Sequence, residues 1–63
     1  MFRIYNILYN NYNLLRSFYE LPECLKFIEQ SDIDPSYILI ISPNGRHISF
    51  TKNRDIVFGG LSK

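Results

Sequence analysis

YILIISPNGRHISF, residues 37–50, is the stretch of this chain that decides its fold. Pro43-Asn44-Gly45 predicts a three-residue hairpin connection. Proline presets φ at the first turn position, and glycine supplies the positive φ that closes a type I turn with a bulge. We therefore expect two antiparallel strands, 37–42 and 46–51, on either side of this turn.

The two arms of this hairpin differ in their hydrophobic pattern. After the turn, Ile48 and Phe50 alternate with polar residues, which is typical of a strand with one face in water. Before the turn, residues 38–41 are Ile-Leu-Ile-Ile and are apolar on both faces. A strand of this kind needs cover on both sides. The pattern thus predicts a sheet that is completed by contact with another molecule.

The upstream half of the chain predicts a second hairpin and one helix. Residues 2–9 and 14–19 have the composition of strands, and the asparagine-rich segment 10–13 favours a turn between them. Residues 20–31 fit a helix, because Pro22 suits the first turn and apolar side chains recur at helical spacing.

These elements predict a small two-layer α+β domain over residues 1–58. Its sheet would have four antiparallel strands in the chain order ββαββ, with the helix packed on one face. Ile56–Phe58 is a candidate for a short fifth strand, and residues 59–63 are expected to form a mobile C-terminal tail.

Chain length limits how this domain is stabilised. A chain of 63 residues buries only about 60% of its unfolded surface, so small domains often need a disulfide, a metal or a partner. Cys24 is the only cysteine and His47 the only histidine, which excludes an internal disulfide and disfavours a Cys/His metal site. Oligomerisation or partner binding remains as the way to stabilise this small domain.

Composition and charge narrow the class of protein further. The net charge is +1, from seven basic and six acidic side chains, so no strong field attracts nucleic acid or a membrane. No apolar run is long enough to span a bilayer, and asparagines interrupt the first fifteen residues. We expect a cytoplasmic protein without a membrane partner. Nine isoleucines, six asparagines and no alanine indicate an A/T-rich reading frame, such as those of phages or mobile elements.

Residues that could carry chemistry favour structural roles in this sequence. Cys24 and His47 could form a nucleophilic pair, but Cys24 adjoins the apolar stripe of the helix and favours a core position. Glu29, Asp32 and Asp34 are too few for a calcium loop, and the required glycine is missing. We therefore expect no enzyme, no metal and no cofactor.

Tyrosine supplies a large, rigid contact area with a polar tip, and interfaces are enriched in it. We predict a small protein–protein interaction or regulatory module, an adaptor or inhibitor that is homodimeric. It would act through a strand edge or a tyrosine-rich sheet face. The predicted interface residues are Tyr5, Tyr9, Tyr19, Tyr37, Leu39 and Ile41. The alternative is a weak nucleic-acid-binding protein that uses Arg46, Lys52 and Arg54.

Overall fold

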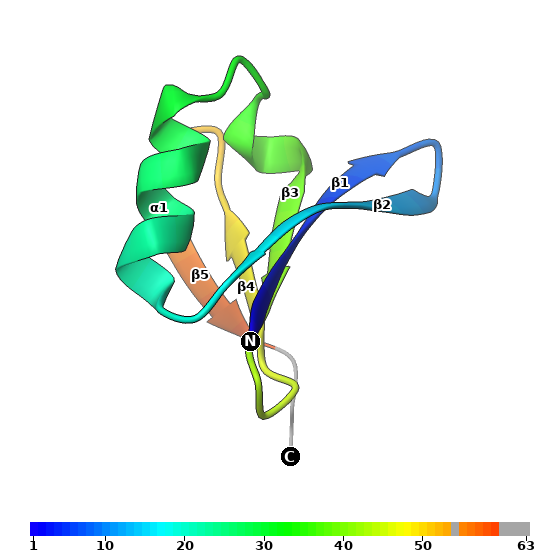
Figure 1. Cartoon of the computed structure of the whole chain (residues 1–63). Helices are drawn as coiled ribbons and strands as arrows, with labels where there is room; N and C mark the ends of the chain where they lie inside the picture. Colours follow the sequence, from blue (N-terminus) through cyan, green and yellow to red (C-terminus); the bar gives the residue numbers. More distant parts are fainter. Residues whose placement is uncertain (54, 60–63) are drawn as a thin grey trace.

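The computed structural model, which describes residues 1–53 and 55–59, is a two-layer α+β fold with one antiparallel sheet and one α-helix (Figure 1). The elements are β1 (Phe2–Leu8), β2 (Asn11–Phe18), α1 (Leu21–Gln30), the 3₁₀ turn η1 (Pro35–Tyr37), β3 (Ile38–Ile41), β4 (His47–Phe50) and β5 (Ile56–Gly59). The predicted fold class is confirmed, and the candidate fifth strand is formed.

The five strands lie in the order β2-β1-β3-β4-β5. The doubly apolar strand β3 is therefore the centre of the sheet, with β1 and β4 as its neighbours. Ile4 of β1 lies opposite Ile40 of β3, and Ile40 lies opposite Ile48 of β4. These three isoleucines form a row across the sheet, and all are buried.

Helix α1 packs over this isoleucine row. Its boundaries follow from capping: the Glu20 backbone N–H donates to Oε1 of Glu23 at 3.2 Å, and the Ser31 hydroxyl donates to the Ile28 carbonyl at 2.9 Å. The helix buries Cys24 and Ile28. The core cluster consists of Ile4, Cys24, Ile28, Ile38, Ile40 and Ile48. Phe18 of β2 and Phe27 of α1 close one side of it, with ring centroids 5.8 Å apart.

The turn at Pro43-Asn44-Gly45 has the predicted geometry. The Gly45 N–H donates to the Ser42 carbonyl at 2.9 Å, and Gly45 has a φ of +87°. The Ser42 N–H donates to the Arg46 carbonyl at 2.9 Å and closes the loop. Glycine is required here because this φ lies in the left-handed region.

The first hairpin differs from the sequence prediction. The turn is not 10–13 but the two residues Tyr9 and Asn10, with φ values of 51° and 67°, and β2 already begins at Asn11. Two consecutive positive φ angles are typical of a type I′ turn, whose twist matches that of the flanking strands. The asparagine-rich composition indicated a turn correctly, but the tight two-residue geometry lets Tyr12 and Asn13 pair within the sheet.

Two further expectations concern chain segments outside the hairpins. Pro35 starts η1 and is buried, while the preceding Asp34 has an extended backbone, as expected before proline. The C-terminal tail is predicted to begin at residue 59, but Gly59 is the last residue of β5. Residues 60–63 lie outside the described residues.

Candidate protein-binding surface

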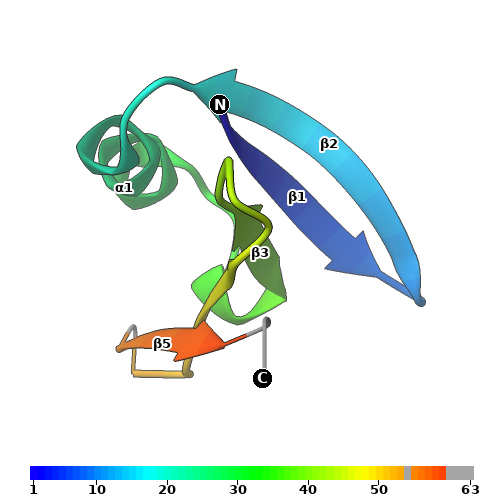
Figure 2. The ribbon, with the colours of Figure 1, turned by 90° about the horizontal axis from the view of Figure 1, so that it is seen from below.

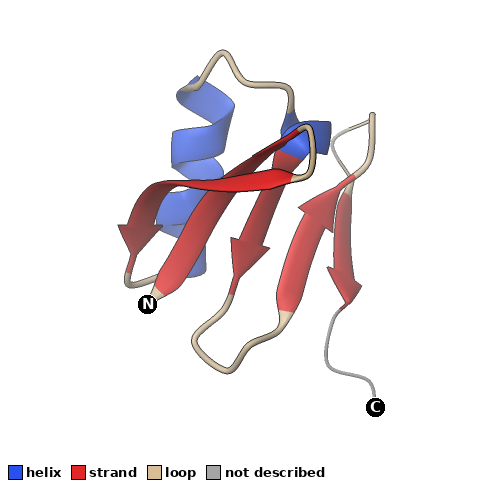
Figure 3. Cartoon of the chain, turned by 90° about the vertical axis from the view of Figure 1, so that its right-hand side faces the viewer, coloured by secondary structure: helices blue, strands red, loops and turns tan. Residues whose placement is uncertain are grey.

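One face of the sheet has no layer of the described chain packed against it. Figure 3 views this side, with α1 behind the sheet. Strand alternation and register place on it every second residue of each strand. We call this surface the open face. Its side chains come from Arg3, Tyr5, Ile7, Tyr12, Leu14, Ser17, Leu39, Ile41, His47, Ser49 and Val57.

Leu39 lies at the centre of the open face. It is opposite Tyr5 of β1 and Ser49 of β4, and Ser49 is opposite Val57 of β5. Leu39 is only 8% exposed although it is not part of the core cluster beneath α1. Neighbouring side chains on the sheet surface cover it. The open face therefore has its own apolar surface around Leu39, on the other side of the sheet from the core. We call this surface the apolar floor.

The β1–β2 hairpin extends this apolar floor beyond the rest of the sheet. Residues 3–6 of β1 pair with β3, whereas Ile7 and Leu8 pair only with β2. The hairpin curves away from the body of the molecule (Figure 2). The rings of Tyr5 and Tyr12 meet edge to face on the open face, with centroids 6.5 Å apart. Leu14 is 56% exposed beside them.

The two basic side chains of the open face, Arg3 and His47, lie toward one end of the strands. Arg3 is opposite Ile41, which is opposite His47, so the two basic residues flank one isoleucine. No carboxylate belongs to the open face within residues 1–53 and 55–59. This surface is thus apolar over most of its area and basic at one end.

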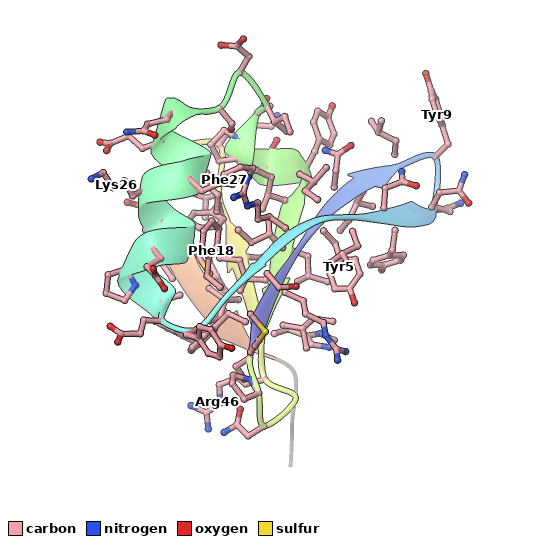
Figure 4. All side chains as sticks on the ribbon, viewed as in Figure 1. Tyr5, Tyr9, Phe18, Lys26, Phe27 and Arg46 are labelled. Carbon is pink, nitrogen blue, oxygen red and sulfur yellow. The ribbon has the colours of Figure 1, made fainter. Side chains whose placement is uncertain are left out.

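The structure brings together three of the six predicted interface residues. Tyr5, Leu39 and Ile41 share the open face, and Figure 4 shows Tyr5 on the side away from α1. Tyr9 occupies the β1–β2 turn and is 94% exposed, and Tyr19 follows β2 and is 79% exposed. Tyr37 ends η1, and its carbonyl accepts a 3.4 Å hydrogen bond from the Asn6 side chain.

The predicted interface did not include four apolar or aromatic members of this surface: Ile7, Tyr12, Leu14 and Val57. The sequence places Tyr12 in a predicted turn. It places Leu14 in a predicted strand but does not indicate which face of the sheet Leu14 lies on. A β-bulge between the pairs Ile4–Arg16 and Tyr5–Leu14 leaves Leu15 unpaired and shifts the alternation of β2. Leu15 consequently packs against the core while its neighbour Leu14 lies on the open face. Nothing in the local sequence marks this shift.

The candidate nucleophilic pair is separated by the sheet. Cys24 is fully buried in the core under α1, whereas His47 is exposed on the open face. Burial raises the pKa of Cys24, with a further contribution from the nearby Glu23 carboxylate. The sheet therefore keeps His47 apart from this thiol.

Asp34, one of the acidic residues considered for a cation site, has a structural role in the turn after the helix. One Asp34 carboxylate oxygen accepts from the Ser36 backbone N–H at 3.0 Å and from the Ser36 hydroxyl at 2.9 Å. This carboxylate thereby caps η1. In the described part of the chain, no three residues of the kinds that ligate metals cluster together.

The residues of the nucleic-acid alternative do not form one patch in the described structure. Arg46 directly precedes β4, and Lys52 follows its far end. Figure 4 places Arg46 at the β3–β4 turn. Arg54 lies outside the described residues. Strand β4 therefore separates the two cations whose positions are described.

Two findings complete this description. No helix within residues 1–53 and 55–59 has the length and apolar character needed to cross a membrane. Comparison of the chain with protein-family models, with curated proteins and with solved structures finds no match. The surface described above is therefore interpreted from its own chemistry.

Proposed function

We propose that this chain is a non-enzymatic interaction module that binds a protein partner on the open face of its sheet. The observation that carries the proposal is the apolar floor around Leu39, with Leu14, Tyr12 and Val57 exposed by 56%, 60% and 45%. Contiguous apolar surface of this kind marks interaction sites on small proteins. Within this proposal, the chain acts as a regulatory adaptor or inhibitor of a larger protein.

The chemistry of the open face describes the partner it would accept. Tyr5 and Tyr12 offer aromatic contact area with polar tips, which suits the centre of an interface. Arg3 and His47 add basic character at one end. A complementary partner surface is apolar and carries a carboxylate near one margin.

Leucine-to-glutamate substitutions on the two faces of the first hairpin test this proposal. Leu14 lies on the open face and Leu8 on the opposite face, and the two are similarly exposed at 56% and 45%. Leu14→Glu introduces a charge into the apolar floor, whereas Leu8→Glu leaves that floor intact.

The measurement is quantitative affinity capture from cells that express the protein, with circular dichroism to confirm that each variant folds. A specific protein retained by the wild type and Leu8→Glu but lost by Leu14→Glu supports the proposal. Equal retention by both variants, or no specifically retained protein, refutes it.

A further inference from the structure

Strand β5 is an unpaired edge without the features that normally protect one. Its outer side pairs with no other strand of residues 1–53 and 55–59. Natural edges are blocked by charged side chains, prolines or bulges. Ile56–Gly59 contains no charged residue and no proline, and its pairing with β4 is regular. Ile56, Val57 and Phe58 are 40%, 45% and 59% exposed.

The opposite edge of the sheet supplies the contrast within the same molecule. Strand β2 carries Asn11, Asn13 and Arg16, and the β-bulge at Leu15 interrupts its regular pairing. These features disfavour the addition of another strand. Within residues 1–53 and 55–59, one edge of the sheet is thus protected and the other is open.

The helix side of β5 is also incompletely covered. Ile56 lies opposite Phe50, and Phe58 lies opposite Ile48, so both side chains lie on the face that α1 covers. The apolar lining of a hollow beside Ile56 includes Leu25, Ile28 and Phe50, with Glu29 as its charged member. A second hollow beside Phe58 has Phe2 and Leu21 on one side and residues 42–44 and Arg46 of the β3–β4 turn on the other. Apolar side chains from an added strand would enter this space beside α1.

We propose that β5 pairs antiparallel with β5 of a second copy of this chain. A second copy is the favoured occupant because the strand is neutral and self-complementary, so antiparallel self-pairing places no like charges opposite each other. The two-fold axis of such a pair is perpendicular to the sheet and keeps each side chain on its own face. This inference does not depend on the proposed binding of a partner to the open face.

The alternation of faces restricts the register of this pair. Directly opposite residues must share a face, so one residue of each β5 must lie opposite its own copy. With Val57 on the axis, Ile56 of each copy lies opposite Phe58 of the other. The β-branched side chain of Ile56 and the aromatic side chain of Phe58 then meet across the two strands on the helix face. Such a cross-strand pair is favourable. The contact involves a strand of four residues, which predicts a weak, reversible dimer.

Sedimentation equilibrium from micromolar to millimolar concentration tests the pairing. Val57→Lys places two ammonium groups opposite each other and is expected to leave a folded monomer. Asn13→Lys is the matched control, because it adds the same charge to the edge strand β2. Reversible dimers of the wild type and Asn13→Lys, with loss in Val57→Lys, support the proposal. A wild type that stays monomeric, or equal loss in both variants, overturns it.

Disulfide trapping tests the register without relying on loss of function. Opposite Cα atoms in an antiparallel pair lie roughly 4.5–5.5 Å apart, within the range that a disulfide bridges. Val57→Cys is expected to form a covalent dimer under mild oxidation, whereas Asn13→Cys and the wild type, whose Cys24 is buried, are not. Equal cross-linking of Val57→Cys and Asn13→Cys, or no cross-linking of Val57→Cys, contradicts the register.

Partner binding on the open face and self-pairing of β5 can be contradicted independently of each other. Leu14 belongs to β2, which is the edge strand opposite to β5. Leu14→Glu therefore alters the open face and should leave the self-pairing of β5 intact. A Leu14→Glu variant that no longer dimerises would place the self-contact on the open face and overturn the β5 pairing.

Discussion

At the scale of single residues, Cys24 illustrates how packing decides chemistry. The side chain has no exposed surface and contributes to the core beneath α1. Burial disfavours the thiolate and raises the pKa of the thiol above its usual value of 9.0, and the neighbouring Glu23 carboxylate acts in the same direction. Cys24 is consequently a small hydrophobic residue in the folded state, and its thiol ionises at a higher pH there than in the unfolded chain.

This shift predicts a pH dependence of stability. Because the folded pKa is raised above 9.0, the contribution of Cys24 to stability is complete below that pH and is lost progressively as pH rises above it. Chemical denaturation from about pH 7 to about pH 10 should show a steeper loss of unfolding free energy for the wild type than for Cys24→Ala.

The comparison with Cys24→Ala removes the contribution of other groups. Every other titratable group is present in both proteins, so its contribution cancels in the comparison. The missing sulfur lowers the stability of the variant by an amount that does not depend on pH. Parallel pH profiles for the two proteins would contradict the raised pKa.

Ile40 and Ile41 show how far residue-level sequence reasoning reaches. Both belong to the stretch predicted to need cover on two sides, and that prediction agrees with the central position of β3. The sequence could not say which of the two lies beneath the helix. That assignment depends on the register with β1, where Ile4 pairs with Ile40, and the register is a property of two distant segments.

At the scale of elements, the β1–β2 hairpin combines a predictable strand pair with an unusual turn. Tyr9 has a φ of 51°, a conformation that asparagine and glycine adopt readily and tyrosine does not. Its side chain is 94% exposed, so no packing within the described chain offsets this preference. The asparagine-rich composition predicted a turn, but a tyrosine at the first turn position could not be anticipated from turn propensities.

Tyr9→Asn is therefore expected to stabilise the folded chain. Asparagine tolerates the left-handed region, and removal of the unfavourable backbone conformation should raise the unfolding free energy by about 0.5–1 kcal/mol. Urea denaturation measures the change.

Tyr19→Asn provides the control, because Tyr19 is also highly exposed, at 79%, and is not among the positive-φ residues. This control should not gain stability. A gain of the same size in both variants would attribute the effect to loss of a surface tyrosine rather than to the turn.

At the scale of the whole molecule, the sheet has more apolar surface than one helix can cover. Helix α1 buries one face over Ile4, Ile40 and Ile48, while the open face and the outer edge of β5 remain without cover from the described chain. The surplus was predictable from the short length and the doubly apolar segment. The bulge in β2 was not, because it follows from strand pairing.

Self-pairing through β5 makes thermal stability depend on concentration. Because the dimer contact exists only between folded chains, mass action should raise the midpoint of thermal unfolding as protein concentration increases. Val57→Lys should show a midpoint that does not change over the same range. Differential scanning calorimetry at several concentrations checks both. A concentration-independent midpoint for the wild type would contradict the dimer.

The β-bulge at Leu15 also determines where assembly stops. In a pair joined through β5, strand β2 lies at both outer margins of a single ten-stranded sheet. Each margin then carries the bulge and the polar side chains of Asn11, Asn13 and Arg16. An open, regular margin would recruit further chains and grow into a fibre. Because this margin is irregular, we expect the proposed assembly to end at two copies and to resist amyloid-like polymerisation.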